Sequence, residues 1–174
     1  MFNLIISIIA IALVVVLAGA SLYYGGSAFN EGSSDAKAAT LINQAQQIQA
    51  SATLYSATEG GAPVDIDSLL LEGQYMAAEP VVPVGTPAED GTPYAEWDLH
   101  SSTGGTAADM VAVEMGVGTK SDEGITVEIC ETINEDGAGV VHCHGDVLTN
   151  VSLDSTFEAT VDPQATVATV YMAL

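Results

Sequence analysis

The sequence predicts an α+β protein in which one long N-terminal α-helix packs on a head with an antiparallel β-sheet. Three observations predict this fold class. Residues 1–26, MFNLIISIIAIALVVVLAGASLYYGG, contain no Lys, Arg, Asp or Glu. Residues 27–57 carry a helical repeat of apolar side chains, and residues 58–174 alternate Pro- and Gly-rich segments with β-branched runs. The chain therefore divides into an apolar helix, its amphipathic continuation and a globular head.

The apolar helix is long enough to cross a membrane. Residues 4–22 would span a hydrocarbon core of about 30 Å at about 1.5 Å of rise per residue. A cleaved signal peptide would have a shorter apolar stretch and a basic start, and neither is present. Because membrane anchors are oriented by basic residues on the cytoplasmic side, we infer that a basic leader once preceded Met1.

The continuation of this helix is amphipathic. Apolar side chains recur at steps of four and three along one face: Leu41, Ala45, Ile48, Ala52 and Tyr55. Polar side chains occupy the other face: Asn43, Gln44, Gln46, Gln47 and Ser51. Ser33, Ser34 and Asp35 offer an N-cap for this rear half. We expect one helix over residues 1–57, interrupted or softened near Gly25 and Gly26, whose rear half lies on a sheet.

The head begins with a surface loop over residues 60–94, because four prolines exclude a helix or a central strand: Pro80, Pro83, Pro87 and Pro93. Alternating or β-branched runs then predict antiparallel strands at residues 95–101, 108–115, 156–161 and 166–172. The last of these runs carries no charge, which predicts a buried terminal strand.

The segment SDEGITVEICETINEDG favours a short helix within residues 121–145. Ile125, Ile129 and Ile133 fall four apart, and Ser121 with the acidic pair after it suits a helix N-terminus. The alternation in ITVEI is the argument for a strand instead. A helix would direct Cys130 inward, and the glycines that follow would turn the chain back toward Cys143.

The two cysteines, Cys130 and Cys143, favour a disulfide in an oxidising compartment, because the start of the chain is typical of a membrane-targeted protein. The bridge would close a loop of about 14 residues and stabilise the fold by roughly 3 kcal/mol. Two free buried thiols are the alternative. The formal charge of −21, with 2 basic against 23 acidic residues, excludes direct nucleic-acid binding through a basic surface. It also makes neighbouring copies repel one another unless cations screen them.

No motif predicts an enzyme, a cofactor or a metal site. No nucleophile elbow, phosphate-binding loop or zinc-protease motif is present. The run VHCHGD lacks the spacing of a zinc motif, and the acidic pairs at Asp65/Asp67 and Asp122/Glu123 are expected in a chain this acidic. Asn150 matches the N-glycosylation pattern, which chance also produces often.

Several segments together resemble the type IV pilin family, and in particular its larger type IVb members. The resemblance covers the architecture of the whole chain and is strong over roughly the first third. It is carried by the uncharged run from Phe2 to Tyr24, its amphipathic continuation, the segment DIDSLLLEGQYM after the long helix, and the cysteine pair near the C-terminus. The family usually has a glutamate at the fifth mature position, where this chain has Ile5, or Ile6 if Phe2 comes first. Asn3 could hydrogen-bond a neighbouring subunit or simply lie at the membrane interface.

The resemblance implies a structural subunit of an extracellular filament, held in the inner membrane before assembly, with a pilus assembly machinery and a prepilin peptidase as partners. The filament would be a homopolymer packed through large apolar side chains of the first helix: Phe2, Leu4, Ile5, Ile8, Ile9, Ile11, Leu13, Val14, Val15 and Leu17. Gly19, Gly25 and Gly26 would be weak points where the helix melts in the polymer. The alternatives are a single-span membrane protein with an acidic binding domain, and a pseudopilin or minor pilin of a secretion or pilus machine.

Overall fold

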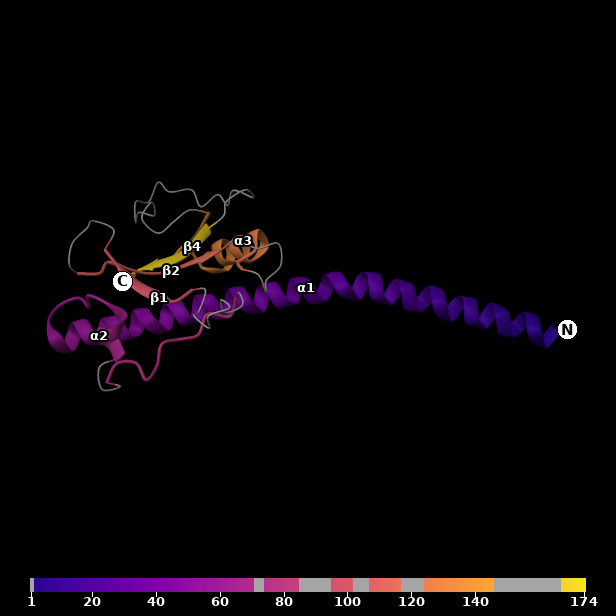
Figure 1. The fold of residues 1–174 in the computed structure, drawn as a ribbon, viewed down its shortest axis with the longest axis horizontal. Coiled ribbons are helices and arrows are strands. Elements are labelled where there is room, and N and C mark those ends of the chain that lie inside the picture. The colour runs from indigo at the N-terminus through magenta and orange to yellow at the C-terminus, as the bar shows by residue number, and fades with distance from the viewer. Residues whose placement is uncertain (1, 71–73, 85–94, 102–106, 117–123, 146–166) are drawn as a thin grey trace. The chain divides into compact units, whose positions relative to one another are not determined.

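The computed structural model describes residues 2–70, 74–84, 95–101, 107–116, 124–145 and 167–174 (Figure 1). Its elements follow the order α1 (Phe2–Glu59), α2 (Ile66–Leu70), β1 (Trp97–His100), β2 (Met110–Gly116), α3 (Val127–Asp136), β3 (Val141–His144) and β4 (Val167–Ala173). The chain forms two compact units, Met1–Ser34 and Asp35–Leu174. It is an α+β protein with a long N-terminal helix, an antiparallel sheet and a disulfide near the C-terminus, which is consistent with a pilin-like fold.

The long helix is confirmed, and α1 is helical from Phe2 to Glu59 without interruption at Gly25 or Gly26. The N-cap expected at residues 33–35 is wrong, because these residues lie inside the helix. Hydroxyl side chains are tolerated in α1 because they donate to the carbonyl four residues earlier, as Ser21 does to Leu17 at 2.9 Å and Thr40 does to Ala36 at 2.7 Å. Melting at the glycines concerns the polymer and stays a prediction.

Within the described residues the sheet has four antiparallel strands in the order β1-β2-β4-β3. Three of its strands confirm the sequence prediction. The strand β1 lies inside the expected run 95–101, and β2 and β4 each extend one residue beyond the expected runs 108–115 and 166–172. The expected strand at residues 156–161 lies outside the described residues. The sequence does not predict β3, whose four residues lie in the run VHCHGD.

The main core of the head lies between one face of the sheet and the rear half of α1. The predicted stripe is confirmed, with Leu41, Ala45, Ile48 and Ala52 buried and Tyr55 packed against them. These side chains share one cluster with the apolar residues of β2 and β4 that alternate toward α1: Val111, Val113, Met115, Ala168, Val170 and Met172. The assignment of Ser51 to the exposed face is wrong, because Ser51 is buried and its hydroxyl donates to the Gln47 carbonyl.

Two helices of the head differ in detail from the sequence prediction. The loop expected over residues 60–94 contains α2, whose first turn is held by the Asp65 carboxylate accepting from the Ser68 amide at 2.9 Å. The predicted helix within residues 121–145 is confirmed as α3, but its N-cap is Thr126, whose hydroxyl accepts from the Ile129 amide at 3.3 Å. The N-cap predicted at Ser121 is wrong, and Ser121 itself lies outside the described residues.

Within the segment ITVEI, Ile125 pairs as a strand residue does, and α3 begins two residues later at Val127. The Ile125 amide donates to the Gly116 carbonyl at 3.0 Å at the end of β2. Ile125, Ile129 and Ile133 are all fully buried, as their spacing predicts. After α3 the chain turns sharply at Gly137, where a Cβ atom would clash with the carbonyl oxygens of Val141 and Ile133. Only glycine therefore allows β3 to follow α3 so closely.

Candidate functional site

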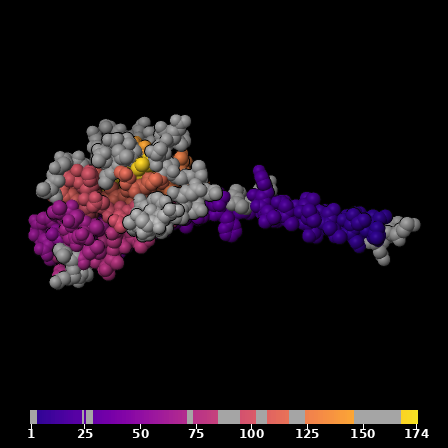
Figure 2. Space-filling model, in the orientation of Figure 1, coloured from indigo at the N-terminus to yellow at the C-terminus, as the bar shows by residue number. Residues whose placement is uncertain are grey.

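The most unusual surface of the described chain is the apolar segment Leu4–Tyr23 of α1 (Figure 2). By length and composition it could span a membrane, and none of it is buried within the protein. The filament-core residues predicted here have side chains that are 53–69% exposed: Leu4, Ile5, Ile8, Ile9, Ile11, Leu13, Val14, Val15 and Leu17. Phe2 lies in α1, but its side chain is not among those described.

An apolar surface of this size is unfavourable in water. Covering one large aliphatic side chain is worth roughly 1.5 to 3 kcal/mol, and soluble monomers rarely expose a continuous apolar patch larger than a few hundred Å². Since residues 1–26 carry no charged side chain, nothing in this segment opposes its transfer into lipid or into a bundle of similar helices. The hydroxyl of Ser21 is already paired with the helix backbone. By length and composition the segment fits a membrane span.

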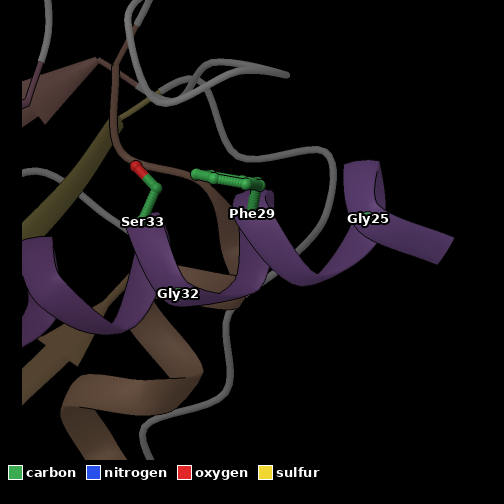
Figure 3. A pocket seen from close by; sticks show the side chains of 4 residues that line it. All are labelled: Gly25, Phe29, Gly32 and Ser33. Atoms are coloured by element: carbon green, nitrogen blue, oxygen red, sulfur yellow. The ribbon is translucent and has the colours of Figure 1, made fainter. Parts of the chain in front are cut away.

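Just beyond this segment, the described side chains of α1 include the exposed ring of Phe29. Gly25, Phe29, Gly32 and Ser33 line a shallow, open hollow on the helix surface (Figure 3). The Phe29 side chain is 83% exposed, and a Cβ atom on either glycine would meet no neighbour. Gly19 likewise lies in open space. The polar side-chain group of this lining is the Ser33 hydroxyl, and the lining residues include no carboxylate, imidazole or amine.

In the head, Gln44 links the rear half of α1 to two other segments. Its amide nitrogen donates to the Val81 carbonyl at 2.7 Å, and its amide oxygen accepts from the Trp97 indole nitrogen at 3.0 Å. Trp97 is 2% exposed and begins β1. Farther along α1, Gln49 donates to the Ala173 carbonyl of β4 at 2.8 Å. These bonds fix the helix to both an outer and a central strand of the sheet.

The end of α1 is fixed by an aromatic pair. The rings of Tyr55 and Tyr75 meet edge to face with centroids 5.2 Å apart. The Tyr75 hydroxyl donates to the Glu59 carboxylate at 2.9 Å, and this hydrogen bond raises the pKa of Tyr75. These contacts hold Tyr75, which follows α1 in the sequence, against the C-terminal end of that helix.

The cysteine prediction is confirmed. Cys130 of α3 and Cys143 of β3 form a disulfide with Cα atoms 5.3 Å apart, and both are fully buried, which rules out the alternative of two free thiols. Asn134, one turn after Cys130, forms two hydrogen bonds with the backbone of Cys143. Its amide nitrogen donates to the Cys143 carbonyl at 3.0 Å, and its amide oxygen accepts from the Cys143 amide at 2.8 Å.

The histidine-rich run on β3 does not form a metal centre in the described part of the chain. Cys143 is in the disulfide, and the His142 ring stacks on Tyr171 with centroids 5.5 Å apart. No group of three His, Cys, Asp or Glu side chains among the described residues could hold a metal ion. Asp146, Asp122 and Glu123 lie outside these residues, as does Asn150, so the glycosylation prediction is untested.

The acidic side chains of the head include one with a distinctive environment. The pKa of the Glu79 carboxyl is raised because partial burial disfavours its charge, and Glu96, Asp67 and Asp98 add repulsion. The hydrogen bond that Glu79 accepts from the Trp97 amide at 2.9 Å opposes this shift. The pKa of Asp65 is lowered instead, because Ser68 donates to it from both its hydroxyl and its amide.

Sequence reasoning missed three residues that organise the head. It placed Gln44 on the polar face of the helix and gave no role to Glu79 or Asn134. The available signal for Gln44 was its position next to the apolar stripe of the helix. For Asn134 it was an uncharged polar residue one turn after a cysteine. Comparison of the chain with protein-family models, with curated proteins and with solved structures finds no match.

Proposed function

We propose that this chain is the structural subunit of an extracellular helical filament of the type IV pilus kind, which polymerises through the apolar front of α1. The observation that carries the proposal is the segment Leu4–Tyr23, whose large aliphatic side chains are all left uncovered by the protein's own fold. The head, by contrast, closes its own core over the rear half of α1. The longest run of exposed large apolar side chains among the described residues therefore lies on the front of α1.

A membrane and a helix bundle are the two environments that can cover this rod. In the inner membrane the segment spans the bilayer as an unassembled subunit. Transfer from lipid into a bundle brings little hydrophobic gain, because lipid tails are as apolar as Leu, so the bundle is stabilised by van der Waals packing between copies. Contacts between non-equivalent surfaces that do not close into a ring produce an open helical polymer. Ile5 would lie inside that polymer, so docking would proceed without the family's usual glutamate.

A single-span membrane protein with an acidic outer domain is the second candidate. The observation in its favour is the same helix, which by length and composition is sufficient for a membrane span. A pseudopilin or minor pilin would share the packing physics and form short fibres. The net charge of −21 disfavours close packing of heads at low salt, so the filament needs screening by cations.

Electron microscopy of material sheared from the cell surface separates these candidates. Long filaments containing this chain support the proposal, whereas exclusive recovery of the chain in membranes supports the single-span protein. A paired variant sharpens the test: Leu13→Ala with Leu17→Ala removes two side chains four residues apart, 59% and 65% exposed, and leaves an uncharged span. We expect normal membrane levels and loss of filaments.

Leu54→Ala is the matched control, because Leu54 is similarly exposed, at 52%, but lies on the rear part of α1 in the head unit. It should leave filaments unchanged. Wild-type filament yield from the Leu13/Leu17 variant would show that this surface is not the filament core.

A further inference from the structure

The front of α1 carries two series of residues that each recur every seven positions. One series consists of exposed large apolar side chains and the other of small residues: Val15, Leu22 and Phe29, and Ala18, Gly25 and Gly32. The second series lies three residues after the first, so the two alternate at steps of three and four along one face of the helix. This face, termed the seam, has the a and d pattern of a coiled coil, with large residues at one position and small residues at the other.

The seam continues beyond the segment that could span a membrane. That segment ends at Tyr23, and Phe29 lies six residues farther along α1, about 9 Å at about 1.5 Å of rise per residue. Phe29 is the only large apolar residue in the stretch 25–34. Its ring is exposed, so the protein's own fold does not cover it. A hydrocarbon core that ends at Tyr23 does not reach it either.

No close contact among the described residues requires the two glycines beside Phe29. Glycine inside a helix costs stability relative to alanine, yet α1 is helical at both, and a Cβ atom on either would meet no neighbour. In a coiled coil, a side chain enters a hole between four residues of the facing helix. Gly25, Phe29 and Gly32 are three of the four positions around the hole that would receive a Phe29 ring, and they line the open hollow on α1 (Figure 3). Glycine at two of them makes room for the ring and lets the two backbones approach closely.

Charge and symmetry favour a second copy of this chain as the partner. Residues 1–30 carry no charged side chain, so the net charge of −21 lies entirely beyond them. Two copies therefore repel one another through their acidic parts and not along the seam. Copies inserted in one membrane point the same way, which makes their α1 helices parallel. In that orientation the ring of each copy meets the hole of the other, because ring and hole lie on the same face.

We infer that the seam seats a parallel α1 helix of a second copy, with the Phe29 ring of each copy in the hole between Gly25 and Gly32 of the other. The inference deepens the proposed function and rests on it for the statement that this contact serves a filament. It extends the contact between subunits past the apolar segment Leu4–Tyr23. It also needs α1 to stay helical through Gly32, as it is here, whereas the melting predicted from the sequence would break the seam at Gly25.

Sedimentation equilibrium of the full chain in density-matched detergent micelles tests this inference, because detergent covers Leu4–Tyr23 and leaves the rest of the seam to act. Phe29→Ala removes the ring, and we expect association to weaken at least tenfold. Gly32→Leu fills the hole and should weaken association as strongly. The added leucine meets no neighbour within the described part of its own chain and improves helix propensity, so it should not disturb the fold. If the face were merely adhesive, the leucine would strengthen association instead.

Asn30→Leu is the matched control. It adds the same side chain at an exposed position one residue after Phe29, which lies about 100° away around the helix and off the seam. It should associate as the wild type does. The inference is overturned if the wild-type chain is monomeric in micelles, if Phe29→Ala associates as tightly as the wild type, or if Gly32→Leu associates more tightly. Cells that carry the wild-type chain and form no filaments would refute the proposed function, and the micelle measurement would still decide the seam.

Discussion

Replacing Gln44 by Ala should loosen the head from α1, and the structure sets the size of the effect. The variant removes the bonds to the Val81 carbonyl and to the Trp97 indole nitrogen. Each neutral hydrogen bond contributes about 1 kcal/mol net, and a buried donor left unpaired costs about 1 to 3 kcal/mol. Trp97 is 2% exposed, whereas Gln44 is half-buried, so water can reach part of the vacated site. We expect a loss of about 2 kcal/mol in the free energy of unfolding.

Urea unfolding of the full chain in micelles measures this loss through Trp97, the only tryptophan of the chain. With a typical urea dependence of about 1 to 3 kcal/mol per molar, the midpoint should fall by roughly 1 M. Gln46→Ala is the matched control, since Gln46 is exposed on the same helix and the change in helix propensity is identical. Gln44→Glu retains the acceptor for Trp97 and loses the donor to Val81, so it should be intermediate. Equal midpoints for Gln44→Ala and Gln46→Ala would refute the reasoning.

Two further predictions concern the disulfide and Glu79. Replacing Cys130 and Cys143 together by Ser should lower the free energy of unfolding by about 3 kcal/mol, from the loop of about 14 residues that the bridge closes; urea midpoints that do not change would contradict this. Because the pKa of Glu79 is raised, the folded head binds its proton more tightly than the unfolded chain does, and ionisation at rising pH costs stability. Glu79→Gln keeps an acceptor for the Trp97 amide, so its stability relative to wild type should increase between pH 4 and pH 7. A constant difference across that range would refute the assignment.

The α+β class and most elements could be predicted because they depend on local patterns. A repeat of apolar residues indicates which face of an element is buried, even when the surface that covers it is unknown. Such repeats are the stripe from Leu41 to Ala52, the stripe from Ile125 to Ile133 and the alternation in β2. The strand β3 could not be found in this way. It is four residues long, and the sequence Val-His-Cys-His is a strand because it pairs with β4 and follows the turn at Gly137.

The sequence by itself determined the composition of the apolar rod, the acidic character of the chain and the cysteine pair, because these follow from residue types alone. Tertiary structure decided which polar groups matter. Gln44, Glu79 and Asn134 find their partners 37, 18 and 9 residues away, and no periodicity records such a separation. It also decided that Thr126 caps α3 and that Ser51 is buried, because hydrogen-bonding and burial depend on neighbours that only the folded chain brings together.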